Sequence, residues 1–262
     1  MPRVVGRQDS LNSENRKFEQ VSLDEPVFLN SVPKCGTHLF RNIVRMFVPV
    51  EQQYHKMFIQ IPVLHQHLAA FSKTKPCLSW GHLLFSDNSA IALKDVRHTL
   101  LVRDPYSWVL ARARFFLSDT FQGSLEHLKG DKANMDDVLN MMIFGIHDKS
   151  PSLKDIFMHN GAAWIGTSAK ILKMEELVNA VKNLDSDGAE QYFSTVLAHC
   201  GIKTLPDDWR ERVRIGSDRK QSATARENLA GQKAQVPDEL PDEQKRLVNF
   251  AVPGLRELLG YY

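Results

Sequence analysis

The sequence contains only three cysteines, Cys35, Cys77 and Cys200, and no two of them form a C-x-x-C pair. An odd number of widely spaced cysteines is not typical of a disulfide framework, and a structural zinc site needs closely spaced ligand pairs. His65 and His67 form such a pair, but no third ligand stands at a convincing spacing. We therefore expect a reducing compartment and no bound metal.

Long apolar runs are also missing. No stretch of about 18 apolar residues is present, so the sequence predicts no membrane span, and the polar N-terminus lacks the apolar core of a signal peptide. The charge is balanced, with 33 Lys and Arg against 31 Asp and Glu, which does not favour a nucleic-acid partner. These absences predict a cytoplasmic protein whose partner must be inferred from local charge.

The 262 residues that are present are enough for one sizeable domain. Residues 1–24 are polar with few apolar anchors, so we expect a flexible lead-in followed by a single domain over residues 25–262. Near the other end, residues 209–226 read "WRERVRIGSDRKQSATAR" and predict a basic loop. A run of this kind is most often a solvated charged face.

Three segments of the chain pair a strand with a helix. They are "PVFLNSV" with "THLFRNIVRMFV", "HTLLVRDPYSWVLARARFFL", and "SAKILKMEELVNAVKNL" with its strand at 169–174. In the second segment, Asp104 suits the N-cap position and Pro105 the first helical position. Alternating strands and helices predict an α/β fold of three layers, a central parallel sheet flanked by helices. Ligands of such sheets bind at the carboxyl ends of the strands, where all three connecting loops lie.

The first of these loops, "LNSVPKCGTHLFRN" at residues 29–42, predicts an anion site. A helix N-terminus offers unpaired N–H groups and the positive end of its dipole. Lys34 adds a positive charge and Thr37 a hydroxyl. Lys34 precedes Gly36, whereas a triphosphatase would place its lysine after the second glycine of G-x-x-x-x-G-K-[ST]. We therefore exclude triphosphate hydrolysis.

Two interpretations of the loop remain. In the first, Cys35 attacks a phosphoester as a thiolate and Arg41 clamps the phosphate oxygens, as in a cysteine-dependent phosphatase. Against it, Arg41 would lie inside the helix, more than a turn beyond its start. The second interpretation comes from a resemblance.

The segment "PKCGTHL" resembles the 5′-phosphosulfate loop of sulfotransferases that use 3′-phosphoadenosine 5′-phosphosulfate (PAPS), which reads P-K-[SC]-G-T-x. "SWGHLLF" is similar to the T-H-L-P or G-H-L-P segment of that family, and "LLVRDPYSWVLARARFF" resembles its 3′-phosphate segment. "KILKMEELV" resembles the Y-E-D-L segment, and "VRIGSDRKQS" is similar to the basic R-K-G loop. The order of the segments matches the family from about residue 26 to the end.

The resemblance implies a P-loop-like sulfotransferase fold and transfer of a sulfuryl group from PAPS to a hydroxyl or amine acceptor, without a metal. It implies His82 as the general base, Lys34 as a catalytic cation, and Arg103 as the ligand of the 3′-phosphate. The donor-binding residues that it implies are Lys34, Cys35, Gly36, Thr37, His38, Arg103, Arg214 and Gly216. In-line transfer of this kind depends mainly on positioning and on neutralising charge.

The sequence departs from the family at several positions. Ala111 replaces the serine eight residues after Arg103, and we hypothesise that Ser107, one turn earlier on the same helix face, supplies the hydroxyl instead. Leu39 replaces an aromatic residue that often stacks on adenine, Met174 replaces the tyrosine of Y-E-D-L, and Trp80 replaces a lysine before the base. The adenine and 3′-phosphate contacts therefore stay open.

The acceptor is not specified by any one segment. Phe115, Phe116, Met158 and the segment "NMDDVLNMMIFGI" are candidates for an apolar pocket or for core, and we prefer a small or amphipathic acceptor to a glycan. Of Arg112 and Arg114, which face different ways on one helix, at most one reaches the nucleotide. A phosphatase and a nucleotide-binding module without catalysis stay open as alternatives.

Overall fold

The computed structural model describes residues 3–4, 9–123, 125–130, 132–222 and 236–262. Its main sheet has four parallel strands in the order β3-β2-β4-β6, at Leu78–Gly81, Val27–Ser31, Arg97–Val102 and Lys170–Lys173. β2 lies inside the sheet, and all five of its residues are buried, as expected for a parallel strand covered on both faces. The short strands β1 (Arg3–Val4) and β5 (Phe121–Gln122) form a separate antiparallel pair.

Helices flank this sheet. They are α1 (Leu11–Asn15), α2 (Thr37–Val44), α3 (Asp87–Leu93), α4 (Pro105–Leu117), α5 (Met135–Phe144), α6 (Leu153–Asn160), α7 (Met174–Lys182), α8 (Asp187–His199), α9 (Trp209–Ser217), α10 (Asp242–Ala251) and α11 (Leu255–Leu258). Short 3-10 helices lie at Arg45–Phe47, Val50–Gln52, Ile61–Gln66, Leu68–Phe71, Glu126–Leu128 and Ala162–Trp164. None of the helices in the described residues is long and apolar enough to cross a membrane.

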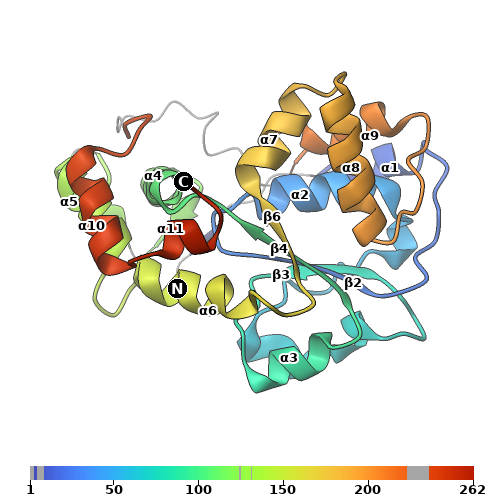
Figure 1. Cartoon of the computed structure of the whole chain (residues 1–262), viewed down its shortest axis with the longest axis horizontal. Helices are drawn as coiled ribbons and strands as arrows, with labels where there is room; N and C mark the ends of the chain where they lie inside the picture. Colours follow the sequence, from blue (N-terminus) through green and yellow to red (C-terminus); the bar gives the residue numbers. More distant parts are fainter. Residues whose placement is uncertain (1–2, 5–8, 124, 131, 223–235) are drawn as a thin grey trace.

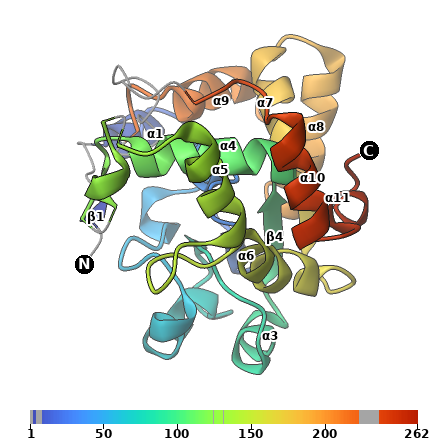
Figure 2. The same ribbon diagram turned by 90° about the vertical axis from the view of Figure 1, so that its left-hand side faces the viewer.

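The helices lie around the strands in three places. In Figure 1, α2, α7, α8 and α9 lie on one side of the sheet and α3 on the other, while α4, α5 and α10 gather at the left. Figure 2 shows α5 crossing in front of α4, and these two helices are in contact. The predicted α/β architecture, a parallel sheet flanked by helices, is thus confirmed.

The three predicted strand–helix units are β2–α2, β4–α4 and β6–α7. At the start of α4, a carboxylate oxygen of Asp104 accepts a hydrogen bond from the N–H of Tyr106 at 2.9 Å, and Pro105 occupies the first helical position. Each unit passes from strand to helix within a few residues. The connecting loops therefore lie together at one end of the sheet.

Two expectations need correction. Residues 9–24, expected to be flexible, pack against the domain: Leu11 is fully buried, and the side-chain amide of Asn15 donates to the carbonyls of Arg45 and Val48 at 2.6 and 3.0 Å. The few apolar side chains of this segment are enough to hold it against the domain, because the buried Asn15 side chain adds these hydrogen bonds. The domain limits themselves stay a prediction.

The basic run 209–226 was expected to be a solvated loop, but residues 209–217 form the helix α9. Trp209, Val213 and Gly216 are buried at helical spacing, so one face of α9 packs inward although most of its other side chains are charged. Gly216 allows the close approach, because a Cβ there would lie 2.7 Å from the carbonyl oxygen of Asn42 on α2. Residues 223–226 lie outside the described residues.

Candidate functional site

The loop between β2 and α2 turns through two residues with positive φ. Lys34 has φ 68° and Gly36, the N-cap of α2, has φ 89°. The positive φ favours glycine at position 36, and a Cβ there would also displace the flexible end of the Met174 side chain. A lysine in the left-handed region is uncommon, and such backbone strain concentrates at functional sites.

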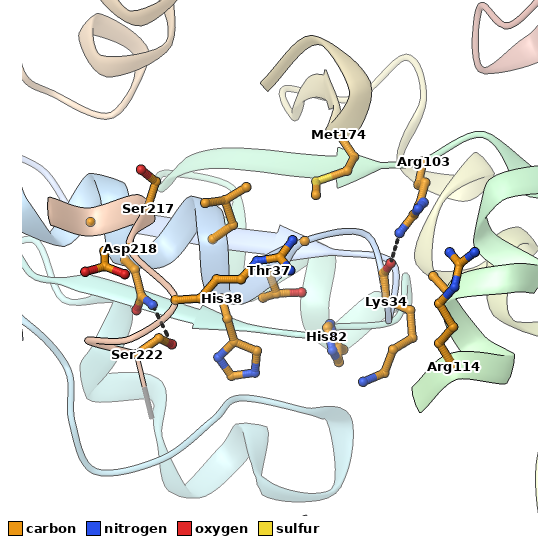
Figure 3. A pocket seen from close by; sticks show the side chains of 16 residues that line it. Lys34, Thr37, His38, His82, Arg103, Arg114, Met174, Ser217, Asp218 and Ser222 are labelled. Carbon is orange, nitrogen blue, oxygen red and sulfur yellow. Dashed lines mark hydrogen bonds between the residues drawn. The ribbon is translucent and has the colours of Figure 1, made fainter. Parts of the chain in front are cut away.

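This loop opens into a narrow cavity of about 200 Å³, which we call the loop cavity (Figure 3). Of the residues predicted for the site, the structure brings together Lys34, Gly36, Thr37, His38, His82, Arg103 and Gly216. Other lining residues are Leu39, Asn42, Ala111, Arg114, Met174, Ser217, Asp218, Arg219 and Ser222. The first turn of α2 borders the cavity, where helix N–H groups lack intrahelical partners.

The loop cavity is strongly basic. Lys34, Arg103, Arg114 and Arg219 line it, whereas Asp218 is the one acidic residue among the described lining residues. A cation excess next to a helix N-terminus favours an anion with several charges. Arg114 and Arg219 were not assigned to the site from the sequence. We expected at most one of Arg112 and Arg114 to reach the nucleotide; Arg114 lines the loop cavity and Arg112 does not.

Arg103 follows β4 and is held by its neighbours. Its Nε donates to the hydroxyl of Ser107 at 2.8 Å, and its Nη1 lies 3.5 Å from the carbonyl oxygen of Lys34. The Ser107 hydroxyl in turn lies 3.2 Å from the Asp104 carbonyl oxygen and from a carboxylate oxygen of Glu175. Ser107 does not line the loop cavity, in contrast to its predicted role. Its hydroxyl orients the guanidinium of Arg103 instead.

Cys35 was predicted to contact the donor, and the structure turns it away. Its side chain is fully buried, its Sγ lies 3.9 Å from the carbonyl oxygen of Pro33, and its N–H donates to the carbonyl of Val32 at 3.2 Å. Burial raises the pKa of the Cys35 thiol well above its usual value, so the thiol stays protonated. Arg41 stacks on Trp80, with its guanidinium carbon 4.1 Å from the ring centroid. The two groups of the phosphatase interpretation therefore do not form a site.

Arg214 also lies outside the loop cavity. Its side chain is 56% exposed and forms an ion pair with Asp185 at 2.8 Å. Residues two apart on a helix face nearly opposite ways, so Arg214 cannot share the direction of Gly216. Arg219, beyond the end of α9, supplies the basic side chain instead.

His82 follows β3 and borders the loop cavity. Its Nδ1 lies 2.9 Å from the carbonyl oxygen of Ser31 and 3.1 Å from the Ser31 hydroxyl, which contacts the Thr37 hydroxyl at 2.5 Å. Since a carbonyl only accepts, Nδ1 carries the proton and Nε2 holds the lone pair. Burial, with a smaller effect of the Lys34 charge, lowers the pKa of His82 to about 4, against the partly opposing hydrogen bond to Ser31. The imidazole is therefore a neutral base at pH 7.

A second cavity of about 870 Å³, which we call the aromatic cavity, also borders His82. Lys34, His38 and His82 line both cavities. Its aromatic lining residues are Phe58, Trp80, Trp108, Phe115 and Phe116. The Nζ of Lys34 lies 2.9 Å from the centroid of the Phe115 ring.

The sequence had singled out some of these residues. Phe115 and Phe116 line the aromatic cavity, whereas Met158 does not and is 45% exposed. In the segment "NMDDVLNMMIFGI", Met142 is fully buried in the core. Within the described residues, no group of three or more His, Cys, Asp or Glu side chains is placed to hold a metal ion.

Comparison with known proteins shows that this chain is similar in fold to solved structures. No protein-family model matches the sequence, and no curated protein matches it. Among solved structures, mouse sulfotransferase SULT7A1 complexed with PAP is similar over 96% of this chain and 94% of its own, with 16% identity and a TM-score of 0.57. Retinol dehydratase in complex with androsterone and the inactive cofactor PAP is similar over 88% and 80%, with 14% identity and a TM-score of 0.56. The chain therefore has the fold of the sulfotransferases.

Proposed function

We propose that this protein is a PAPS-dependent sulfotransferase that transfers a sulfuryl group to a hydroxyl or amine of a small or amphipathic acceptor. The observation that carries the proposal is the position of His82. A neutral imidazole, with its lone pair on Nε2, lines both a basic cavity and a mostly apolar one. This arrangement suits a reaction in which an anionic donor and an apolar acceptor meet at one base.

The residues of the loop cavity fit the donor chemically. Lys34 and the first N–H groups of α2 would hold the 5′-phosphosulfate, and Arg103, with its planar fork, would bind the 3′-phosphate. The Asn42 side chain is 3% exposed, and its Oδ1 has no hydrogen-bond partner among the described residues, which leaves an acceptor for an adenine N–H. Because 200 Å³ is below the roughly 300 Å³ of common ligand pockets, we expect residues 218–222 to shift on binding.

PAPS supplies a sulfuryl group that is activated by its phosphate leaving group. His82 Nε2 would accept the proton of the acceptor hydroxyl, a contribution typically worth about 100- to 10,000-fold in rate. Lys34 and the N–H groups of Thr37 and His38 would stabilise the negative charge that develops toward the 5′-phosphate. Loss of one such donor costs on the order of 100- to 1000-fold in kcat.

Calorimetric titration with adenosine 3′,5′-bisphosphate (PAP), beside adenosine 5′-monophosphate, tests the donor site. We expect PAP to bind tightly and the monophosphate weakly, and Arg103→Gln to remove most of this difference because it removes the bidentate contact. Arg97→Gln is the matched control, since Arg97 lies at the opposite end of β4, pairs with Glu25 and lines neither cavity. Equal binding of the two nucleotides to the wild-type protein would contradict the assignment.

A nucleotide-binding module without catalysis is the second candidate. It is favoured by Leu39, Ala111 and Met174, which line the loop cavity at positions where the resemblance leads us to expect an aromatic residue, a serine and a tyrosine. This candidate predicts PAP binding without sulfuryl transfer to any of a panel of phenols and alcohols. Turnover of PAPS with any acceptor in the panel would exclude it.

A further inference from the structure

Arg112 is a buried cation in the wall of the aromatic cavity. It lies on α4 midway between Trp108 and Phe116, four residues from each, so the three side chains share one helix face. The residue is 3% exposed. A guanidinium in such a place stays charged, and its burial needs compensation from its surroundings.

The hydrogen bonds of the buried Arg112 guanidinium do not satisfy all of its N–H groups. Nη1 donates to the Met142 carbonyl at 2.9 Å, and Nη2 donates to the Ser150 hydroxyl and the Pro151 carbonyl at 2.5 and 2.6 Å. The guanidinium carbon also lies 4.9 Å from the Trp108 ring centroid. No acidic side chain of the described residues forms an ion pair with Arg112. A guanidinium has five N–H donors, so the Nε–H and one Nη1–H are left without a hydrogen bond among those residues.

A second donor without a partner lines the same cavity. Asn160, at the end of α6, is 3% exposed, and its Nδ2 has no hydrogen-bond partner among the described residues. Buried amides of this kind are normally bonded. Asp155 is the one acidic residue among the described lining residues, and its carboxylate already accepts from the N–H and hydroxyl of Ser152 in the capping box of α6. The unsatisfied groups of this wall are therefore donors.

We infer that the acceptor is an apolar hydroxy acid: its hydroxyl reaches His82, and its carboxylate is bound by Arg112 with help from Asn160. This inference rests on the proposed function and narrows its acceptor class. A carboxylate would supply the missing counter-ion and accept the free N–H groups, while the aromatic side chains enclose the carbon skeleton. The cavity volume of about 870 Å³ leaves room for a ring with a side chain.

The first test compares matched acceptors on the wild-type protein. The probes are ω-(4-hydroxyphenyl)alkanoic acids with side chains of increasing length, each beside its methyl ester, in which the hydroxyl is the same and only the charge differs. We measure binding to the protein saturated with PAP, and turnover with PAPS. At one or more chain lengths, the acid should exceed its ester by about 10- to 100-fold in affinity and kcat/KM, the usual worth of a hydrogen bond to a charged group.

Variants then locate the preference. Arg112→Met should reduce the ratio of acid to ester to near one, whereas Arg112→Lys keeps a positive charge and should retain part of it. PAP binding by each variant reports whether the fold is intact. If Arg112→Met does not fold, because Arg112 also links α4 to the α5–α6 connection, the wild-type ratio decides the question by itself.

The two possible failures look different. If PAP binds but no acid is preferred to its ester, or no probe binds at all, the hydroxy-acid inference is overturned. The nucleotide site is then unaffected. Absence of PAP binding and of all turnover would contradict the proposed function itself. Equal turnover of acid and ester would show that Arg112 only holds the helices together.

Discussion

The protonation of His82 is the most direct test of the proposed chemistry. The imidazole has a lone pair to offer only if it is neutral, and burial lowers its pKa to about 4. An unperturbed histidine, with a pKa near 6.5, is about one-quarter protonated at pH 7, whereas a pKa near 4 leaves about one molecule in a thousand protonated. The low value leaves the imidazole unprotonated over the whole physiological pH range.

Proton and nitrogen NMR of the ring measures this in the protein without nucleotide. We expect the His82 Cε1–H resonance, assigned by its loss in His82→Gln, to stay unchanged from pH 7.5 down to about pH 5. The nitrogen shifts should show Nδ1 protonated and Nε2 free, because Nδ1 donates to the Ser31 carbonyl. A titration midpoint above pH 6, or a proton on Nε2, would refute the reasoning.

The same shift links His82 to stability. Between pH 4 and 6.5 the unfolded chain binds this proton and the folded chain does not, so the free energy of unfolding falls as the pH is lowered through this window. From pH 7 to pH 5 the loss due to His82 is about 2 kcal/mol, at 1.36 kcal/mol per pKa unit. Urea unfolding at both pH values should show a correspondingly smaller loss for His82→Gln. An identical loss would contradict a depressed pKa.

Three further substitutions test the loop cavity. Gly36→Ala should lower the free energy of unfolding by about 1–3 kcal/mol and abolish PAP binding, because of its positive φ and the contact of a Cβ with the Met174 side chain. Gly188→Ala is the control in the same urea titration and should be neutral or stabilising, because Gly188 is helical and a Cβ there would meet only Ser186 Oγ, at 3.9 Å. Cys35→Ser should leave sulfuryl transfer intact, since the thiol faces the core, and a folded but inactive variant would revive the cysteine mechanism. Arg219→Gln should weaken PAP binding about tenfold by calorimetry, the usual worth of one charge-assisted hydrogen bond, whereas Arg214→Gln should leave it unchanged. The opposite ranking would show that the wrong arginine was assigned.

Local signals in the sequence were enough for the framework of the fold. Buried parallel strands read as short apolar runs, and the Asp104–Pro105 pair marks a helix start by its own chemistry. Gly36 likewise indicates a turn in which the backbone adopts a positive φ. These features depend on residues near one another in the chain, so a pattern can reveal them.

Features that depend on packing could not be predicted in the same way. α9 is mostly charged, and its helical face becomes visible only when Trp209 and Val213 are seen to be buried. Arg214 lies within α9 and Arg219 lies beyond its end, and the sequence did not show where this helix ends. Ser107 does not line the loop cavity; its hydroxyl contacts Arg103 and also Glu175, which is distant in sequence. The aromatic cavity is assembled from segments between Val4 and Asn160 that no single pattern connects.

The division between the two cavities also has an evolutionary meaning. Apart from Lys34, His38 and His82, the residues that line one cavity do not line the other, and α4 serves each with different side chains. A substitution at Phe116 or Arg112 would therefore change the lining of the aromatic cavity without altering that of the loop cavity. Selection could then act on the loop cavity and on the aromatic cavity separately. Under the proposed function, a few mutations in the aromatic cavity would change the acceptor while the donor site and His82 stay the same.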